Sequence, residues 1–260
     1  PGRGLVMVLA CSWLGVSIAY SEEEKDYYRL VTIATSAAPT GSRAKFWKPP
    51  PKDLVLEVSG MAILDKRRLA VTIRKGEVWF LDGVYDEPPR NVKYRRFASA
   101  LHEPLGLLKH GDAFYTAQRT ELTRLRDTDG DDVADEYLSI ANGWGVTGNY
   151  HEYSYGPKLD RDGNLWLTLN IGMGFQGNQR SLMVSNKSLG VAQARWRGWG
   201  VKVTPQGQLV PVCAGMRSPS GLGSNRAGDM FYTDQQGNWV GTNSLHHMRS
   251  GAFFHHPEAL

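Results

Sequence analysis

Short apolar stretches alternate with polar turns over most of residues 53–260. Four of the turns, LDKRR, KHGD, DRDGN and NRAGD, each lead into a strand-like stretch. These stretches are LAVT (69–72), AFYT (113–116), LWLT (165–168) and MFYT (230–233). A composition rich in aromatic, β-branched and leucine residues is typical of half-buried strands. Because no segment of useful length with helical periodicity separates them, the pattern predicts an all-β fold.

The same stretches form a sequence repeat. In three copies a Gly is followed twelve residues later by a Thr and four residues after that by a second Gly: Gly60–Thr72–Gly76, Gly156–Thr168–Gly172 and Gly221–Thr233–Gly237. A further copy, Gly106 to Thr116, is two residues shorter and has Thr120 in place of the second Gly. A third strand follows, as in EVWFL (77–81) and ELTRL (121–125), and residues 200–212 predict a hairpin around Pro205-Gln206-Gly207.

Recurring units of about four short strands are typical of the blades of a β-propeller. A β-sandwich with coincidental spacing is the alternative. Because about four blades are visible, we expect them to be part of a six-bladed propeller that spans residues 53–260 and is truncated at its C-terminus.

The N-terminal residues resemble a targeting segment. Arg3 precedes an apolar run, residues 5–19, which ends in the small-x-small sequence Ser17-Ile18-Ala19. This arrangement predicts a signal peptide at residues 1–19, an extension or linker at 20–52, and a periplasmic or secreted bacterial protein. A lipoprotein box around Cys11 is the alternative.

Charge and cysteine content narrow the classes of function. The formal net charge is +4, with acidic and basic residues interspersed. The doublets Arg67-Arg68 and Arg95-Arg96 are too short for a nucleic-acid-binding patch, so we expect no nucleic-acid partner. Cys213 is the one cysteine left after signal removal, and we expect it to be a buried core residue.

One position before the repeat carries an ionisable side chain in three of the four copies. The residue four positions before the first Gly, called the lead-in position below, is Leu56, His102, Glu152 or Arg217, and His151 adjoins it in the third copy. The innermost strands of a propeller line a central channel, so the segments leading into them meet near one mouth. Ionisable groups that converge on a pocket are typical of a binding or catalytic site.

His151 and Glu152 lie in the tyrosine-rich sequence NYHEYSYG. A neutral imidazole near a carboxylate is the usual arrangement for removing a proton from an alcohol. A hydrogen-bonded histidine that fills the channel mouth is the equally weighted alternative.

The acidic sequence DTDGDDVADEY (127–137) offers carboxylates at Asp127, Asp129, Asp131 and Asp135. Calcium prefers several carboxylate oxygens, and a tight loop with alternating acids supplies them. The sequence departs from calcium loops at Asp132, where glycine is usual, and at Leu138, which replaces the bidentate acid. We predict a structural calcium site that stabilises an interblade loop, with a solvated acidic turn as the alternative.

Two histidine doublets, His246-His247 and His255-His256, are further metal candidates. Adjacent residues of a strand point in opposite directions, and no nearby acid completes a ligand set. We expect surface or loop histidines here.

The sequence also resembles a known family. AGMRSPSGLGSNRAGDMFYTDQQGN (214–238) is similar to the Arg-Asn-Pro-x-Gly-Leu segment of soluble quinoprotein glucose/sorbosone dehydrogenases. The residues from RTELTRLRDTDGDDVADEY through NYHEYSYGPKLDRDGNLWLTLN to LHHMRSGAFFHHP more closely resemble the secreted "membrane-bound dehydrogenase-like" propeller proteins of planctomycetes and verrucomicrobia. This resemblance covers about residues 55–260.

The resemblance implies a six-bladed propeller with pyrroloquinoline quinone (PQQ) in the channel mouth, calcium beside it, and a sugar or alcohol as substrate. His151 matches the base of the dehydrogenases, and Arg217 matches the arginine that pairs with the quinone oxygens. Glu-Tyr-Ser-Tyr intervenes between His151 and Gly156, and Ser218 replaces the Asn, which are two departures from the pattern. Relatives in the secreted group often carry a cytochrome c module, so a cytochrome c is a candidate electron acceptor.

The sequence therefore favours an extracytoplasmic dehydrogenase that oxidises a sugar or alcohol with PQQ. His151 and Glu152 are the catalytic candidates, and Arg217 and His102 are the cofactor-binding candidates. A non-catalytic propeller that binds glycan or protein partners and a calcium-dependent lactonase-like hydrolase are the alternatives.

Overall fold

The computed structural model describes residues 27–29, 31, 57–65, 68–89, 92–173, 190–191, 194–236, 241–256 and 259. The chain divides into two units, residues 1–32 and 33–260, and every strand belongs to the second. The expected signal peptide lies outside the described residues, as does the lead-in residue Leu56. No helix among the described residues is both long and apolar enough to cross a membrane.

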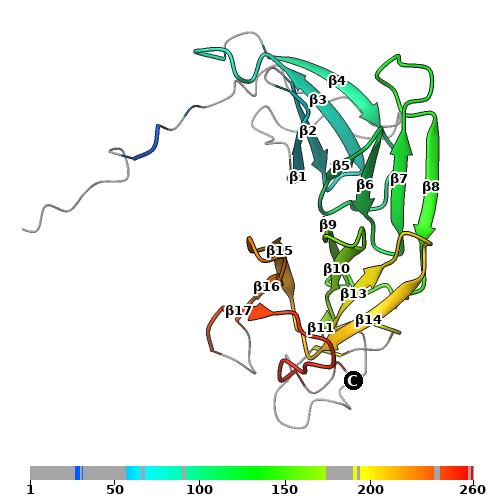
Figure 1. Ribbon diagram of the computed structural model, residues 1–260, viewed down its shortest axis with the longest axis vertical. Helices are drawn as coiled ribbons and strands as arrows, with labels where there is room; N and C mark the ends of the chain where they lie inside the picture. The colour runs from blue at the N-terminus through cyan, green and yellow to red at the C-terminus, as the bar shows by residue number, and fades with distance from the viewer. Residues whose placement is uncertain are drawn as a thin grey trace, which may run out of the picture. The chain divides into compact units, whose positions relative to one another are not determined.

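Antiparallel sheets follow one another along the second unit, each beginning with its innermost strand (Figure 1). The first contains β1 (Val58–Ile63), β2 (Arg68–Ile73), β3 (Glu77–Asp82) and β4 (Lys93–Ala98). The second contains β5 (Leu108–His110), β6 (Ala113–Ala117), β7 (Leu122–Arg126) and β8 (Glu136–Ala141). The third contains β9 (Ser154–Leu159), β10 (Leu165–Leu169), β13 (Trp199–Val203) and β14 (Leu209–Ala214), and the fourth β15 (Pro219–Ser224), β16 (Met230–Asp234) and β17 (Ser244–His247).

This arrangement confirms the all-β fold and the four blades of a β-propeller. The predicted polar turns join the first and second strands of each blade. The hairpin around Pro205 joins β13 to β14. In the third blade a short hairpin of β11 (Gly172–Met173) and β12 (Gly190–Val191) intervenes between β10 and β13, so Gly172 does not lead directly into the third strand.

The repeated Gly and Thr face each other across the first two strands of a blade. Gly60 pairs with Thr72 and Gly221 with Thr233, and the Gly221 N–H donates to the Thr233 Oγ1 at 3.0 Å. In the second blade the Thr116 Oγ1 donates to the Gly106 carbonyl at 2.7 Å. Thr72, Thr116 and Thr168 are fully buried, whereas Thr233 in the fourth blade is exposed.

The innermost strands pack glycine against glycine. A Cβ on Gly60 would lie 2.4 Å from the Gly106 carbonyl carbon, and one on Gly106 would lie 2.2 Å from the Gly156 oxygen. The Gly156 N–H donates to the Leu105 carbonyl at 3.0 Å, which ties the third blade to the second. The spacing of the repeat is therefore set by the close approach of neighbouring blades, which leaves no room for a side chain.

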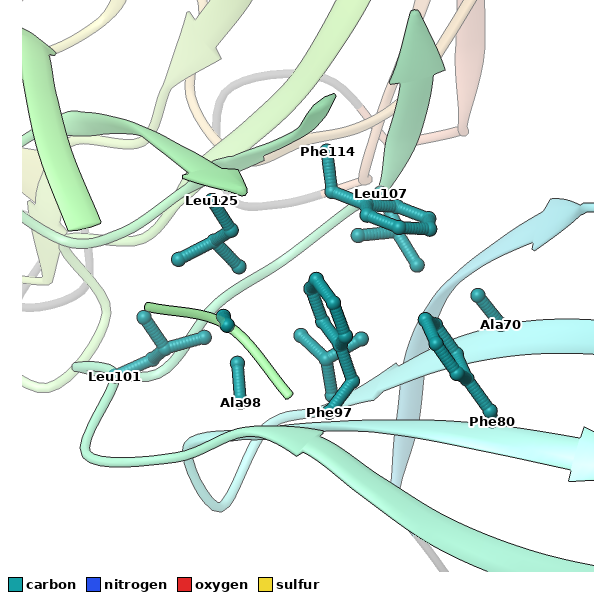
Figure 2. Packing of buried hydrophobic residues seen from close by; sticks show 10 residues of the cluster. Ala70, Phe80, Phe97, Ala98, Leu101, Leu107, Phe114 and Leu125 are labelled. Atoms are coloured by element: carbon teal, nitrogen blue, oxygen red, sulfur yellow. The ribbon is translucent and has the colours of Figure 1, made fainter. Parts of the chain in front are cut away.

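The core lies between blades as well as within them. Figure 2 shows Phe80 and Phe97 of the first blade beside Phe114 of the second. The ring centroids of Phe80 and Phe97 are 4.7 Å apart, and those of Phe97 and Phe114 are 5.0 Å apart. Cys213 of β14 is 1% exposed in an apolar cluster formed by the third and fourth blades, and burial raises the pKa of its thiol to about 12. It is therefore an inert core residue, as expected.

Candidate functional site

The segments that lead into the inner strands carry the predicted site residues, and these residues differ in how far their side chains are buried. His151 and Arg217 are half-buried, Glu152 is fully buried, and His102 is exposed. The hydrogen bonds described for His102 are made by its backbone, whose N–H donates to Gln118 and whose carbonyl accepts from Arg119.

His151 is held in its loop between polar and aromatic groups. Its backbone N–H donates to the Asn149 Oδ1 at 3.0 Å, and its ring centroid lies 4.0 Å from that of Tyr150. Burial, and then the positive charges of Arg217 and Arg119, lower the pKa of the imidazole. The His151 ring is therefore uncharged at neutral pH, with cations from two other blades nearby.

Arg119 is a site residue that the lead-in position did not reveal. Its guanidinium donates to the Asn149 carbonyl at 2.9 Å and to the Tyr150 carbonyl at 2.6 Å, directly before His151. It also pairs with Glu103 and lies 4.7 Å from the Tyr153 ring centroid. Arg119 is 8% exposed and follows β6 in the second blade. It therefore fixes the His151 loop of the third blade against the second blade.

A chain of ion pairs extends from Arg119 to the first blade. Glu103 also accepts from Arg74 at 2.9 Å, and Arg74 pairs with Glu57 at 2.9 Å. Burial opposes the charge of Arg74, but the neighbouring carboxylates outweigh it and raise the pKa of the guanidinium. The carboxylates of Glu57 and Glu103 in this series of ion pairs are thus neutralised by arginines. The lead-in segments of the first three blades are joined by charge-assisted hydrogen bonds.

Glu152 points away from this cluster. Its carboxylate accepts the Thr147 N–H at 2.7 Å and the Thr147 hydroxyl at 2.9 Å, and it is 0% exposed. It also stabilises the charge of the buried Arg197. This placement assigns Glu152 to holding the loop that carries His151 rather than to contact with a ligand.

Arg217 is anchored through its backbone, and its guanidinium makes one hydrogen bond to the residues that the structure describes. The Arg217 N–H donates to the Asp234 Oδ2 at 2.9 Å, and its Nη1 donates to the Gln236 carbonyl at 3.2 Å. Burial lowers the pKa of Arg217, and the charge of Asp234 opposes this effect. Arg217 acts electrostatically on both His151 and His256, so its positive charge lies near both histidines.

Comparison with known families now places the chain. Residues 81–257, more than half of its length, match the sequence profile of a family described as a domain of unknown function, DUF7133. The chain belongs to the DUF7133 family. No curated protein sequence matches it.

The fold of this DUF7133 chain is shared with solved sugar dehydrogenases. It resembles a glucose dehydrogenase from Thermus thermophilus with 17% identity and a TM-score of 0.55, covering 78% of this chain and 66% of that one. It resembles the PQQ-bound aldose sugar dehydrogenase of Streptomyces coelicolor with 16% identity and a TM-score of 0.54, covering 79% and 64%. For the holo PQQ domain of pyranose dehydrogenase from Coprinopsis cinerea the values are 11%, 0.54, 75% and 51%.

The TM-scores show that the DUF7133 chain shares the β-propeller fold of these sugar dehydrogenases. The chain spans half to two thirds of the length of these proteins. The closer resemblance to the secreted planctomycete and verrucomicrobial proteins stays a prediction.

The acidic loop of the DUF7133 chain, between β7 and β8, brings three of the four predicted ligands together. Oxygens of Asp127, Asp129 and Asp135 lie within 4.8 Å of one another. Asp131 is outside this group, and its Oδ1 accepts the Val133 N–H at 2.8 Å. A backbone hydrogen bond to Asp129 lowers its pKa, but repulsion from the surrounding aspartates outweighs it and raises the pKa overall.

Asp132 resolves one departure from the calcium-loop pattern. Its φ is +66°, the left-handed conformation that glycine usually supplies. Its carboxylate accepts from Arg68 of the first blade at 2.9 Å and lies 3.2 Å from Arg95. The loop therefore contacts the neighbouring blade, as the interblade interpretation requires, and calcium itself stays a prediction.

His255 and His256 lie in a loop, as expected, but the side chain of His256 is buried and not at the surface. Its side chain is 2% exposed, and burial, followed by the charge of Arg217, lowers its pKa to about 4. The sequence offers no sign of this burial, because a His-His doublet next to proline is typical of a surface turn. His246 and His247 are half-buried on β17.

Proposed function

We propose that this DUF7133 domain is a quinoprotein-type dehydrogenase that oxidises a sugar or alcohol, with His151 as the base. The observation that carries the proposal is the uncharged imidazole of His151 beside two guanidinium groups, in a fold shared with sugar dehydrogenases. A general base must be unprotonated at working pH, and the neighbouring cations favour that state.

The residues present fit PQQ, a planar anionic quinone. Arg217 and Arg119 supply positive charge from the fourth and second blades, and a guanidinium binds planar oxygens in a fork. Between them, the N–H of Asn170 donates to Tyr153 and that of Ile171 to the Arg217 carbonyl. The Asn170 side chain is 3% exposed, and its Oδ1 has no hydrogen-bond partner within the described part of the chain. A buried acceptor without a partner is the kind of group that a hydrogen-bond donor of a bound cofactor satisfies.

When bound, the quinone would supply the two-electron acceptor for oxidation of the hydroxyl-bearing carbon. His151 would take the hydroxyl proton on an imidazole ring nitrogen and release it to water, since the side chain is half-buried. Arg119 would hold the His151 loop through the carbonyls of residues 149 and 150. Arg217 would orient the quinone oxygens, and His102 remains a second candidate for contact with the cofactor.

The carboxylates of the described residues argue for a structural rather than a catalytic calcium. Glu57 and Glu103 are paired with arginines, and Glu152 is buried against Thr147. The loop that contains Asp127, Asp129 and Asp135 offers the better ligand set for a hard cation. This distribution also weakens the lactonase alternative, which requires accessible carboxylates at a channel metal.

The test uses the full-length protein that contains this chain. The protein is titrated with PQQ in the presence and absence of calcium, and dye-linked oxidation is measured over a panel of aldoses and alcohols. We expect PQQ binding and turnover, and His151→Ala should abolish turnover while leaving PQQ binding measurable. His110→Ala is the matched control, because His110 is exposed at the end of β5.

Retained turnover in His151→Ala would show that His151 is not the base. Absence of both PQQ binding and oxidation in the wild type would refute the dehydrogenase proposal. Hydrolysis of lactones without PQQ would favour the hydrolase instead.

A further inference from the structure

The fourth blade contains a pocket that shares Arg217 with the proposed reaction but none of the other residues assigned to it. It opens between the end of β16, the start of β17 and the C-terminal segment 252–256, the red end of the chain in Figure 1. Its walls include Arg217, Thr242, Ser244, Phe254 and His256.

The position of His256 in this pocket is fixed by its backbone. The His256 N–H donates to the Gly215 carbonyl at 3.1 Å, and the Phe254 N–H donates to the Ala214 carbonyl at 2.8 Å. These bonds attach the C-terminal segment to the end of β14, so the imidazole is held rigidly.

The ring of His256 nevertheless has unmet hydrogen-bonding capacity. Neither Nδ1 nor Nε2 has a partner within the described ranges of the chain, although the side chain is 2% exposed. Burying such groups unpaired is costly, and native proteins rarely do so without a ligand or water. Because burial and Arg217 keep the ring uncharged at neutral pH, it offers one donor and one acceptor. Because the two nitrogens point in different directions, two hydroxyl groups, one that donates and one that accepts, satisfy that pair.

The charges of the pocket favour a neutral ligand. The positive charge of Arg217 is offset by Asp234, whose carboxylate accepts three backbone N–H groups from residues 217, 218 and 235 at 2.9, 2.7 and 2.9 Å. Arg217 still has guanidinium donors beyond its Nη1 bond to the Gln236 carbonyl. Because Asp234 offsets the charge of Arg217, these donors are suited to the hydroxyl oxygens of a neutral ligand.

An aromatic wall completes the pocket. The Phe254 ring lies 5.2 Å from Tyr232 and 4.8 Å from His246, centroid to centroid. The pocket thus combines an apolar aromatic surface with fixed hydroxyl-bonding groups, including Thr242 and Ser244. A saccharide presents this combination, because its C–H faces are apolar and its hydroxyls lie at the rim.

We propose that this pocket is a separate binding site for a neutral saccharide, whose hydroxyls bind His256 and Arg217 and whose ring packs on Phe254. The site is distinct from the His151 cluster, and saccharide binding here requires neither PQQ nor turnover. Arg217 is the residue that this pocket shares with the proposed dehydrogenase site.

The test measures binding of D-glucose, D-galactose, D-mannose and their methyl glycosides to the full-length protein without PQQ, by isothermal titration calorimetry. Gluconate and acetate serve as anionic probes. We expect at least one neutral sugar to bind, and His256→Phe to weaken it by at least about tenfold, because both ring nitrogens are removed. His256→Gln keeps a donor and an acceptor and should bind with intermediate affinity.

His247→Phe is the matched control, because His247 follows a pocket residue on β17 and is not part of the pocket wall. It should bind sugar like the wild type. His151→Ala should also bind sugar, so that failure of the dehydrogenase proposal and failure of this one give different results. Thermal unfolding of each variant shows whether it is folded.

Three results would overturn the proposal: no binding of any neutral sugar, binding of gluconate or acetate alone, or unchanged sugar binding in a folded His256→Phe variant.

Discussion

Replacing Gly60 by alanine should separate the first two blades. The added Cβ would lie 2.4 Å from the Gly106 carbonyl carbon and 2.5 Å from the Leu107 nitrogen, and both are backbone atoms. An ordinary contact begins at 3.4 Å, so the inner strands must move apart by about 1 Å. Overpacking of this kind costs about 1–3 kcal/mol, and we expect at least about 3 kcal/mol because no side chain can rotate away.

Gly223→Ala is the matched control for Gly60→Ala. Gly223 also lies in an innermost strand, β15, but a Cβ there would meet nothing within 4 Å. Neither glycine has a left-handed φ, so the two substitutions differ in the contact between blades. Gly223→Ala should stabilise the protein by about 0.4–1 kcal/mol, because alanine restricts the unfolded chain.

Urea denaturation gives the free energy of unfolding of both variants, and calorimetry gives Tm. At about 2–4 °C per kcal/mol for a domain of this size, Gly60→Ala should lower Tm by about 6–12 °C. Equal stabilities of the two variants, within about 0.5 kcal/mol, would refute glycine-on-glycine packing of the blades.

Three further results are expected from buried or clustered charges. Arg119→Met should lower the free energy of unfolding in urea by about 1.5–3 kcal/mol, because it removes a buried guanidinium that bonds Glu103 and the carbonyls of residues 149 and 150. Arg124→Met, which breaks a partly exposed pair with Glu136, should lower it by at most about 1 kcal/mol. The pKa of His256, about 4 against an ordinary 6.5, means that the unfolded chain binds more protons between these values. Stability should therefore be constant above pH 6.5 and fall by up to about 3 kcal/mol towards pH 4, and this part of the loss should vanish in His256→Phe. Calcium at 100 times its Kd should raise the unfolding free energy by about 2.7 kcal/mol in the wild type and by less in Asp129→Asn.

Contrary outcomes would be equally informative. Similar losses in the two arginine variants would show that the contacts of Arg119 with the His151 loop contribute little. An unchanged pH profile in His256→Phe would mean that the imidazole titrates normally. A calcium effect of equal size in Asp129→Asn would place the ion elsewhere.

The fold could be predicted because the repeat records a backbone constraint. Gly60 and Gly106 leave no space for a side chain at the contact between blades, and the partner Thr72 and Thr116 are fully buried. Such a requirement produces Gly and Thr residues at a fixed spacing, which can be seen in a single sequence. The hairpin of β11 and β12 is not constrained in this way, so the third blade departs from the pattern after Gly172.

The candidate site was only partly predictable, because burial depends on the direction in which neighbouring side chains point. The lead-in position pointed to Arg217 and to the segment of His151, and the charge of Arg217 acts on the His151 ring across blades, while the roles of both residues stay predictions. It gave Glu152 equal weight, although that carboxylate turns inward to Thr147. Arg119 was missed because it follows the second strand of its blade and not the position before the first.

Arg119 and His256 illustrate two opposite uses of a buried polar side chain. The guanidinium of Arg119 is paired with Glu103 and with carbonyls of the next blade, so its burial stabilises one arrangement of the His151 loop. The imidazole of His256 is equally buried, yet its ring nitrogens have no partners in the described part of the chain. Since an unpaired buried group lowers stability, a chain that retains one carries a cost that a ligand can remove. Arg217 lines the pocket of His256 and also acts electrostatically on His151, so its substitution is a poor test of either site alone. His151 and His256 are the residues to vary independently.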